Sequence, residues 1–392
     1  MPQPADESND RSARRMAVYL ACERFLGSGP PRTLQDILAE LAETTSPDEK
    51  RDFYGSGAVV ASFEQEIAEL LGKEAALVFP SGTMAQQIAL RIWSERKGTK
   101  TVVFHPTCHL ETHEQKGYQH LHGLHGQLAG DPQRLLALAD LEQIPGPVAA
   151  LLLELPQREI GGQLPEWTDL QAQIGWARER GASVHMDGAR LWEAAPFYGR
   201  EYTEIAAPFD SVYVSFYKTL GALAGAALGG PADFIAEARL WRRRHGGDLF
   251  QFAPLVISAR QRLHERLPLV AAYCEQARRI ASVLEGIPGI AIKPNPPQTN
   301  MMHVYLAGDP EDLAERALRI AAEDRVFLFA GARASEVPGW SVFELTITSS
   351  EIDLSDTEIR GYFEQILSDP KSRTETSGPK FRHESSQAQV PG

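Results

Sequence analysis

Short apolar segments alternate with amphipathic segments between residues 53 and 260, and this alternation limits the possible folds more than any other feature of the sequence. The apolar segments, such as "AALVF" and "VAALLLEL", are continuous runs, which is typical of strands buried on both faces. The segments between them carry apolar residues at helical spacing, and Gly72 and Gly181 stand where two of these helices should end. We therefore expect an α/β domain with a largely parallel sheet and helices on both of its faces.

The pattern changes near residue 260. A long helical segment, interrupted near Pro268, leads into strands and helices that alternate less regularly. This change predicts a smaller C-terminal α+β domain at 261–369 after the large domain at 53–260. The remaining segments are a disordered N-terminus at 1–13, a helical segment at 14–52 and a disordered tail at 370–392.

These patterns give a list of expected elements. The expected strands are 75–79, 101–105, 148–155, 183–187, 211–216, 290–294, 301–306, 326–330 and 341–348. The expected helices are 16–26, 33–43, 60–72, 84–93, 168–181, 253–286, 309–324 and 356–367.

Charge and cysteine content exclude several classes of partner. The formal net charge of −13 argues against a nucleic-acid-binding surface, which would need a basic patch. The three cysteines, Cys22, Cys108 and Cys274, are widely spaced and predict a reducing compartment without disulfides. No apolar run is long enough to span a membrane, and the N-terminus lacks the apolar core of a secretory signal. We therefore expect a cytoplasmic protein with no membrane or nucleic-acid partner.

The segment "FPSGTMAQ" (79–86) joins an expected strand to an expected helix. The N-terminus of a helix offers free N–H groups and the positive end of the helix dipole, so it can bind phosphate. Gly82 would let the backbone approach the phosphate, and Thr83 would add a hydroxyl donor. The alternative is that Thr83 simply caps the helix, since threonine is a common N-cap residue.

Two charged groups follow neighbouring strands at the edge where open α/β sheets bind ligands. Asp187 ends one strand, with Arg190 three residues later, and Lys218 follows the next strand. A desolvated lysine has a lowered pKa and can act as a nucleophile that forms a Schiff base. The alternatives are a local Asp187–Arg190 ion pair and a lysine that reaches the surface.

Six of the eleven histidines lie between residues 105 and 125. His109 and His113 have the spacing of metal ligands on a helix, but neither an H-E-x-x-H motif nor a cysteine pair accompanies them. We therefore predict no metal site. The better interpretation is that His109 follows the strand at 101–105 and stacks on an aromatic ligand.

Phosphate, an amine nucleophile, a carboxylate and a flat ring surface are together the requirements of pyridoxal phosphate. In this interpretation Lys218 binds the aldehyde and Asp187 keeps the pyridine nitrogen protonated. A nicotinamide cofactor is not expected, because no G-x-G-x-x-G follows a strand.

Three segments in this order resemble the L-threonine aldolase and β-eliminating lyase group of fold-type I pyridoxal-phosphate enzymes: "FYGSG…FEQEIAELLGKEAALVFPSGTMAQQIAL", "HMDGARLWEA" and "VSFYKTLGALAGAALGG". The likeness runs from about residue 24 to about residue 350. It implies a mostly parallel seven-stranded sheet with helices on both faces and a smaller C-terminal α+β domain. It also implies an active site at the interface of a homodimer or homotetramer.

The resemblance implies specific site residues, with Lys218, His109 and Asp187 as the catalytic ones. The residues expected at the cofactor are Lys218, Ser81, Gly82, Thr83, His109, Asp187, Arg190 and Ser215. The residues expected at the substrate are Ser28, Tyr54, Arg190 and Arg333. The resemblance further implies that Glu114 lies near His109 and that Tyr54 comes from the neighbouring subunit.

Two departures from the family pattern concern groups near the cofactor. Pro156 and Gln157 stand where the family commonly has an asparagine and a histidine after the glutamate of its central strand. Phe250 stands where the family usually has an arginine that reaches a phosphate across the interface. The possible substitutes for this arginine are Arg243, Arg244 and His245.

A third departure concerns the substrate. Glu344 occupies the place of the small-domain arginine that binds the substrate carboxylate in the family, and Arg333 is a possible substitute from another loop. A guanidinium group binds a carboxylate through two hydrogen bonds, so its loss is expected to change how the substrate carboxylate is bound.

The resulting prediction is a pyridoxal-phosphate lyase that cleaves or forms the Cα–Cβ bond of a β-hydroxy-α-amino acid, giving glycine or a related amino acid and an aldehyde. The third departure leaves open other carbanion reactions of the same cofactor: β-elimination, racemisation and aldehyde exchange between amino acids. A non-catalytic homologue is a further alternative, because fold alone does not establish function.

Overall fold

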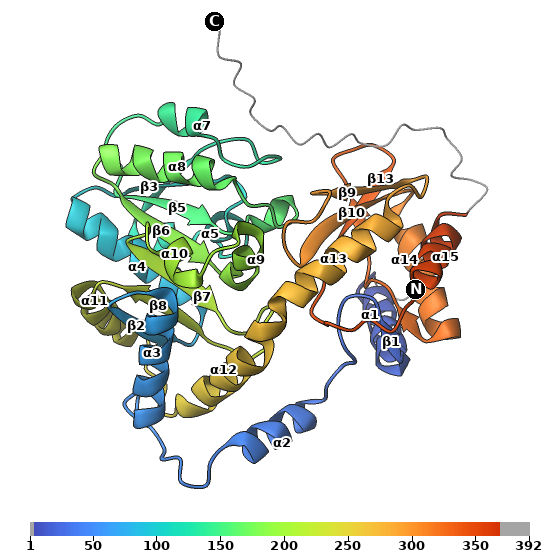
Figure 1. Cartoon of the computed structure of the whole chain (residues 1–392), viewed down its shortest axis with the longest axis horizontal. Helices are drawn as coiled ribbons and strands as arrows, with labels where there is room; N and C mark the ends of the chain where they lie inside the picture. Colours follow the sequence, from blue (N-terminus) through green and yellow to red (C-terminus); the bar gives the residue numbers. More distant parts are fainter. Residues whose placement is uncertain (1–3, 369–392) are drawn as a thin grey trace, which may run out of the picture. The chain divides into compact units, whose positions relative to one another are not determined.

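A computed structural model describes residues 4–368 of the chain (Figure 1). These residues form two compact units. The larger unit consists of residues 32–274, and the smaller one combines residues 4–31 with residues 275–368. The sequence placed this boundary at residue 260, whereas in the structure it falls inside one helix, between Cys274 and Glu275.

The larger unit is built around a seven-stranded sheet. Its strands, in spatial order, are β2 (Ala75–Phe79), β8 (Ala226–Gly230), β7 (Ser211–Ser215), β6 (Ser183–Gly188), β5 (Ala150–Glu154), β3 (Thr101–Phe104) and β4 (His125–Leu128). All strands run in one direction except β8, which is antiparallel to both of its neighbours. The expected α/β class and the mostly parallel sheet are therefore confirmed.

The larger unit also contains helices and short 3₁₀ turns, several of which cover the sheet (Figure 1). They are α2 (Leu34–Thr44), α3 (Ala58–Leu71), α4 (Gly82–Lys97), α5 (His109–Thr112), α6 (Gly117–His122), α7 (Leu138–Glu142), η1 (Arg158–Ile160), α8 (Trp167–Glu179), η2 (Leu191–Glu193), α9 (Ala194–Tyr198), α10 (Tyr202–Ala206), α11 (Ala232–Arg244), α12 (Ala253–Arg266), η3 (Leu267–Leu269) and α13 (Val270–Leu284), which crosses the boundary between the units.

Alternate residues of each central strand enter two different hydrophobic cores. In β5, Leu151 and Leu153 pack with α3 and α8, whereas Ala150 and Leu152 pack with α4 and α11 on the opposite face. Side chains on a strand alternate between its two faces, so a strand covered on both sides must be apolar throughout. This is the physical reason for the continuous apolar runs in the sequence.

The smaller unit contains a four-stranded antiparallel sheet in the order β12-β13-β10-β9 and a two-stranded parallel pair, β1-β11. Its elements are α1 (Pro4–Ala21), β1 (Arg24–Phe25), β9 (Ile290–Lys293), β10 (Met301–Ala307), α14 (Pro310–Asp324), β11 (Val326–Phe327), β12 (Arg333–Ala334), β13 (Trp340–Thr346) and α15 (Asp356–Leu367). A separate hydrophobic core joins the four-stranded sheet to α14 and α15, and the expected α+β character is confirmed.

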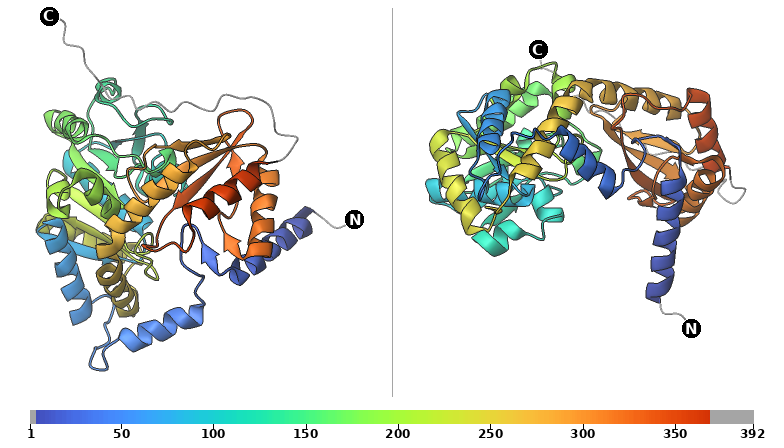
Figure 2. Two further views of the ribbon diagram at one scale, coloured as in Figure 1. Left: turned by 45° about the vertical axis from the view of Figure 1, so that its right-hand side comes forward. Right: turned by 90° about the horizontal axis from the view of Figure 1, so that it is seen from below.

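The N-terminal segment differs from its prediction. Helix α1 begins at Pro4, so most of the segment expected to be disordered, 1–13, is helical. Proline is favourable at the first position of a helix. Figure 2 shows α1, in dark blue, beside α14, in orange. The ring of Tyr19 packs against Phe327 at 4.7 Å, and this contact attaches residues 4–31 to the rest of the smaller unit.

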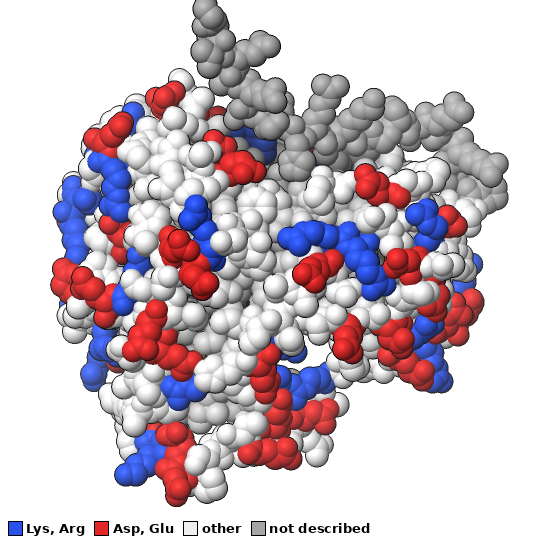
Figure 3. All heavy atoms as spheres, in the orientation of Figure 1, with Lys and Arg blue, Asp and Glu red and all other residues white. Residues whose placement is uncertain are grey.

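The tail predicted at 370–392 lies outside the described residues. Among the helices within residues 4–368, none combines the length and the apolar character needed to cross a membrane. On the face drawn in Figure 3, basic and acidic side chains are intermingled rather than separated by sign.

Candidate active site

Three polar side chains form a row across the carboxyl ends of neighbouring strands in the larger unit. Glu154 on β5 is in register with Asp187 on β6, which is in register with Tyr213 on β7. Leu152 and Tyr213 belong to the core on the α4 side, so this alternation places Glu154 and Asp187 on the same face of the sheet. The carboxyl ends of parallel strands are the usual ligand-binding edge of an open α/β sheet.

Asp187 is buried, with 1% of its surface exposed, and both of its carboxylate oxygens accept hydrogen bonds. Gln86 Nε2 on α4 donates to Asp187 Oδ2 at 2.7 Å, and the backbone N–H of Ala189 donates to Oδ1 at 3.1 Å. In the described part of the chain these bonds take the place of the Asp187–Arg190 ion pair considered from the sequence. Asp187 is therefore held in position by its neighbours rather than by an adjacent cation.

Lys218 lies three residues beyond the end of β7 and is half-buried. Burial lowers the pKa of Lys218 below its usual range, and the nearby Arg190 guanidinium lowers it further. The carboxyl groups of Asp187 and Glu154 oppose this shift in the pKa of Lys218. A lowered pKa leaves more of the amine neutral, and only the neutral amine can attack a carbonyl.

A buried carboxyl group connects the Arg190 segment with the Lys218 segment. Glu193, at the end of η2, has no exposed surface, and Thr219 Oγ1 donates a hydrogen bond to its Oε1. Burial raises the pKa of Glu193 from 4.5 to about 7, although the Thr219 bond and the charges of Arg190 and Lys218 oppose the shift. Thr219, which follows Lys218 in the chain, is thus held by Glu193, a residue for which the sequence suggested no role.

The first turn of α4 has the features predicted for a phosphate site, with one difference. Ser81, rather than a threonine, caps the helix and accepts a hydrogen bond from Met84 N at 3.3 Å. Thr83 is exposed, so its hydroxyl is accessible to a ligand. A Cβ atom at Gly82 would lie 2.0 Å from the phenolic oxygen of Tyr213. The glycine is therefore required by packing between α4 and β7, whereas the sequence had suggested that a phosphate required it.

His109 is held by the carboxylate that the sequence placed near it. Its Nδ1 lies 3.0 Å from Glu114 Oε1, and Gln87 Nε2 donates to the other oxygen of Glu114 at 3.3 Å. Because a carboxylate accepts hydrogen bonds, Nδ1 of His109 carries the proton and Nε2 is left as an acceptor. Glu114 is buried and His109 is half-buried, which is suitable for a proton acceptor at the edge of a site.

Glu154 was not given a role from the sequence, yet it belongs to the row that includes Asp187. Burial raises the pKa of Glu154, and the neighbouring charge of Asp187 raises it further. The backbone N–H of Arg158 donates to Glu154 Oε1 at 3.1 Å and opposes this shift. Two neighbouring carboxyl groups do not ionise independently, so Glu154 carries a proton more readily than an isolated glutamate.

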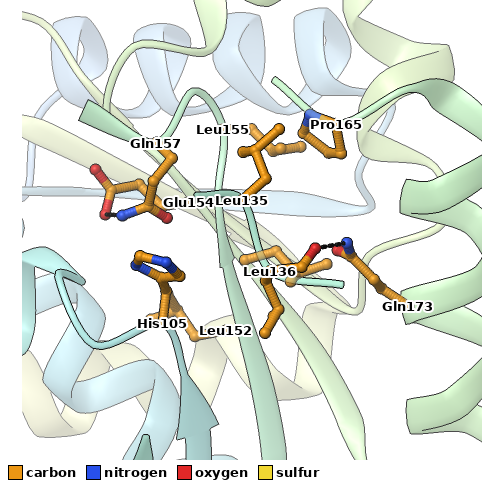
Figure 4. A pocket seen from close by; sticks show the side chains of 10 residues that line it. His105, Leu135, Leu136, Leu152, Glu154, Leu155, Gln157, Pro165 and Gln173 are labelled. Atoms are coloured by element: carbon orange, nitrogen blue, oxygen red, sulfur yellow. Dashed lines mark hydrogen bonds between the residues drawn. The ribbon is translucent and has the colours of Figure 1, made fainter. Parts of the chain in front are cut away.

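Gln157, which replaces the family's histidine, connects Glu154 with a small cavity (Figure 4). Its Nε2 donates to Glu154 Oε2 and to Thr107 Oγ1, both at 3.2 Å. The cavity has a volume of about 20 Å³ and is also lined by His105 and Gln173. This is enough space for one water molecule. Gln157 thus acts as a neutral hydrogen-bond donor at a position where the family has a titratable ring.

Three other histidines of the cluster have different partners. His105 Nε2 lies 2.9 Å from two backbone carbonyl oxygens, and His113 Nε2 lies 2.8 Å from Glu159 Oε1. The ring of His122 lies 4.9 Å from the ring of His245. Within residues 4–368, no group of three or more His, Cys, Asp or Glu side chains is arranged to hold a metal ion.

The segment around Tyr54 forms an exposed aromatic cluster consisting of Phe53, Tyr54 and Phe250. These side chains are 55%, 55% and 52% exposed, and the Phe250 ring packs edge-on against the other two. The buried carboxylate of Asp52 fixes this arrangement by accepting hydrogen bonds from the backbone N–H groups of Gly55, Phe252 and Ala253. A rigid, exposed aromatic group is typical of a surface that contacts another molecule.

The three suggested substitutes for the family's phosphate arginine lie around the end of α11. Arg243 and Arg244 are exposed, and Arg244 stacks over Trp241 at 4.4 Å. The neighbouring Arg242 is instead buried, with bonds to Val78 O at 2.7 Å and to Asp248 Oδ1 at 2.8 Å. The sequence did not distinguish this buried arginine, which ties α11 to β2, from its exposed neighbours.

Ser28 and Arg333 belong to the smaller unit, where they line the same hollow of about 460 Å³. Glu344 lines this hollow as well and is exposed. The structure therefore brings together, within one unit, two of the four predicted substrate residues and the glutamate that replaces the family's arginine.

The donor set of the larger unit fits pyridoxal phosphate. Lys218 provides an amine with a lowered pKa, and Asp187 provides a carboxylate already fixed by two N–H donors. The capped N-terminus of α4, with the exposed Thr83, provides phosphate donors, and His109 provides a ring. The sequence missed the supporting residues Gln86, Gln87, Glu154 and Glu193, whose only signal was a polar side chain beside apolar residues. It also missed Arg242, for which a run of three arginines gave no signal of burial.

Comparison with known proteins agrees with this geometry. Residues 36–308 match the model of the β-eliminating lyase family. The chain is 28% identical over 294 residues to low-specificity L-threonine aldolase 1 of Arabidopsis thaliana, which covers 71% of this chain and 81% of the relative. It is 30% identical over 316 residues to aldolase vrtJ of Penicillium aethiopicum, covering 77% of this chain and 78% of the relative.

A solved structure is similar over almost the whole chain. A candidate L-allo-threonine aldolase from Listeria monocytogenes EGD-E superposes with a TM-score of 0.86 at 39% identity, covering 91% of this chain and 99% of that chain. The family match covers more than half of the chain, and this likeness agrees with it in fold. The chain described here belongs to the β-eliminating lyase family, and it is an enzyme of the fold-type I class.

Proposed function

We propose that this enzyme is a pyridoxal-phosphate-dependent aldolase that cleaves a β-hydroxy-α-amino acid between Cα and Cβ, giving glycine or a related amino acid and an aldehyde. The observation that carries the proposal is the placement of Lys218, with its lowered pKa, beside Asp187 at the carboxyl edge of the sheet. Membership of the β-eliminating lyase family and likeness to threonine aldolases support it.

The proposed cofactor site uses residues of the larger unit. Lys218 would attach the cofactor, Asp187 would pair with its ring nitrogen, and His109 would stack on its ring. Ser81, Gly82, Thr83 and Ser215 would hold its phosphate and ring edge, and Arg190 would contact its phenolic oxygen. Pyridoxal phosphate, when bound, supplies an electron sink for the pair released as the Cα–Cβ bond breaks.

His109 is the proposed base. Its Nε2 accepts the proton of the substrate's β-hydroxyl group, while Glu114 holds Nδ1–H and so fixes the tautomer and the ring orientation. Arg190 binds the substrate carboxylate, and we propose that Ser28, Tyr54 and Arg333 also contact the substrate. The neutral Gln157, in place of a second histidine, leaves His109 as the imidazole assigned to this proton transfer.

A second candidate function keeps the cofactor and changes the bond that breaks. The exposed Glu344 in the hollow with Ser28 and Arg333 favours a substrate whose carboxylate is bound differently from that of threonine. β-Elimination, racemisation and aldehyde exchange between amino acids therefore remain the alternative reactions.

Product analysis tests both candidates. The holoprotein should release glycine, or a related amino acid, and an aldehyde in equal amounts from at least one member of a panel of β-hydroxy-α-amino acids. Ammonia with a keto acid would indicate elimination, and incorporation of an added aldehyde would indicate exchange. A protein that binds the cofactor but yields no aldehyde from any member would refute the aldolase assignment.

The Lys218→Ala variant is the matched control. It should fold, lose the visible absorbance of the bound cofactor, and release no product above background. Borohydride reduction of the wild-type holoprotein should fix the cofactor covalently to the peptide that contains residue 218. Labelling of a different lysine would refute the role of Lys218.

We further propose a cytoplasmic homodimer or homotetramer in which a second subunit completes the site. The aromatic cluster of Phe53, Tyr54 and Phe250 supports this proposal, because each of the three residues is more than half exposed in the single chain. Tyr54 would then contact the substrate of the neighbouring subunit.

A further inference from the structure

Two consecutive glutamines, Gln86 and Gln87, lie in the second turn of α4 and are almost completely buried, with 1% and 3% of their surfaces exposed. Glutamine is mostly exposed in folded proteins, and a buried amide costs free energy unless it is hydrogen-bonded. Their burial therefore raises the question of which groups they bind.

Gln86 binds the carboxylate at the end of β6. Its Nε2 donates to Asp187 Oδ2 at 2.7 Å, and the backbone N–H of Ala189 donates to Oδ1 at 3.1 Å. Both oxygens of Asp187 thus accept N–H hydrogen bonds, which is the pattern expected of a carboxylate rather than a carboxylic acid.

The other end of the Gln86 amide supports this interpretation. Gln86 Oε1 is buried and has no hydrogen-bond partner in the part of the chain that is described. Reversing the amide would place this oxygen against the Asp187 carboxylate, where the two acceptors repel each other. The side chain thus leaves one acceptor unpaired in order to present its donor to Asp187.

Gln87 binds the second carboxylate of the site. Its Nε2 donates to Glu114 Oε2 at 3.3 Å, while His109 Nδ1 lies 3.0 Å from Glu114 Oε1. A Cβ atom at Gly117 would lie 2.4 Å from Gln87 Nε2, so a glycine is needed there for the amide to reach Glu114. Glu114 is therefore fixed between a helix and the histidine that it orients.

We propose that Gln86 and Gln87 are positioning residues, through which α4 orients Asp187 toward the ring nitrogen of the cofactor and, by way of Glu114, His109 toward the substrate. This inference rests on the proposed function. The helix whose first turn would bind the phosphate would then also fix, from its second turn, the acid and the base of the same site. Neither glutamine contacts the reacting atoms in this proposal.

Gln86→Met tests the first half, because methionine keeps the volume and removes the amide. We expect the dissociation constant for pyridoxal phosphate to rise on the order of 10- to 100-fold. We also expect the pH midpoint of the bound cofactor's visible absorbance to shift by roughly one unit, a tenfold change in the underlying equilibrium. Gln86→Glu, which places a second carboxyl group against Asp187, provides an independent variant if the methionine variant fails to fold.

Gln173→Met is the matched control. Gln173 is an equally buried glutamine on α8, and it donates to Leu136 O at 2.6 Å, outside the carboxylate pairs. The Gln173→Met variant should have a lower melting temperature but an unchanged cofactor affinity and an unchanged pH midpoint of the cofactor's absorbance. The proposal for Gln86 is overturned if neither Gln86 variant changes these two quantities, or if Gln173→Met changes them equally.

Gln87→Met tests the second half. We expect a shift of roughly one pH unit in the NMR titration of the His109 ring, and an equal shift in the corresponding limb of the kcat/KM profile. The NMR resonance is assigned by its loss in His109→Asn. An unchanged His109 titration would overturn this half. Because affinity, absorbance and NMR require no turnover, the inference can be judged even if the aldolase assignment fails.

Discussion

At the scale of single residues, the site depends on carboxyl groups that are buried without a cation in direct contact. Glu193 is the most enclosed of them: Thr219 donates to one of its oxygens, and the other has no partner among the described residues. Burial raises the pKa of Glu193 from 4.5 to about 7. The folded protein therefore retains a proton at pH values where the unfolded chain has lost it.

Because of this difference, Glu193 lowers the free energy of unfolding by an amount that depends on pH. Below pH 4 both states are protonated and Glu193 does not change the stability. As the pH rises from about 4 to about 7, only the unfolded state loses the proton, so the free energy of unfolding falls by about 3 kcal/mol. We expect Glu193→Gln, which keeps the acceptor for Thr219, to remove this decrease. Urea unfolding of the wild-type protein and the variant between pH 4 and pH 8 measures the free energy of unfolding. Parallel pH profiles of the two proteins would contradict the prediction.

At the scale of elements, the position of α4 is set by its close approach to β7. Gly82 lies at the start of the helix, where a Cβ atom would be 2.0 Å from the phenolic oxygen of Tyr213 and 2.5 Å from its Cζ. Tyr213 is itself buried within the sheet, so its ring cannot turn away easily. The helix that carries Ser81, Thr83 and the two glutamines is thus held in place by a contact that excludes a side chain.

Gly82→Ala should therefore destabilise the protein. We expect a loss of about 1–3 kcal/mol, as for other overpacked cores, and weaker cofactor binding because the helix N-terminus must move. Gly175→Ala is the control, because Gly175 lies within α8 and a Cβ atom there would meet nothing within 4 Å.

The control should instead gain about 0.5–1 kcal/mol, since alanine favours the helix. Thermal unfolding of the two variants should shift in opposite directions. Equal shifts would show that the Tyr213 contact does not position α4.

At the scale of the whole molecule, the exposed aromatic cluster argues that the single chain is not the functional form. Phe250 packs against both Phe53 and Tyr54, and the backbone around them is fixed by the buried Asp52. Exposed aromatic rings that are already rigid lose little conformational freedom on binding, which favours their use in an interface.

Phe250→Ser should weaken the proposed oligomer. We expect the species measured by sedimentation velocity to shift toward the monomer at micromolar concentration, because the central ring of the cluster is lost. Leu138→Ser is the control, since Leu138 is a partly exposed leucine on α7, outside the cluster. A wild-type protein that is monomeric at all concentrations, or a Phe250→Ser variant that remains fully associated, would contradict the proposal.

Local signals in the sequence were sufficient for most elements. Gly72 and Gly181, predicted as helix ends, have φ values of 60° and 67°, a conformation that favours glycine. The uninterrupted apolar runs became central strands because side chains on both faces of these strands are buried. The sequence also predicted residues of the candidate site, because Asp187 ends one apolar strand run and Lys218 follows the next by a few residues.

Long-range packing determines the features that local signals in the sequence do not predict. Gln86 and Asp187 are 101 positions apart, and no local pattern indicates that an amide on one helix will face a carboxylate at the end of a distant strand. Residues 4–31 join the smaller unit through β1–β11 pairing, although they precede the larger unit in the chain. Gly82 is needed for a tyrosine that lies 131 positions later. By itself, the sequence determines which groups can react and which segments form helices or strands, because both features depend on neighbouring residues in the chain. The partners that orient those groups are determined only by tertiary packing, since they are brought together from distant segments.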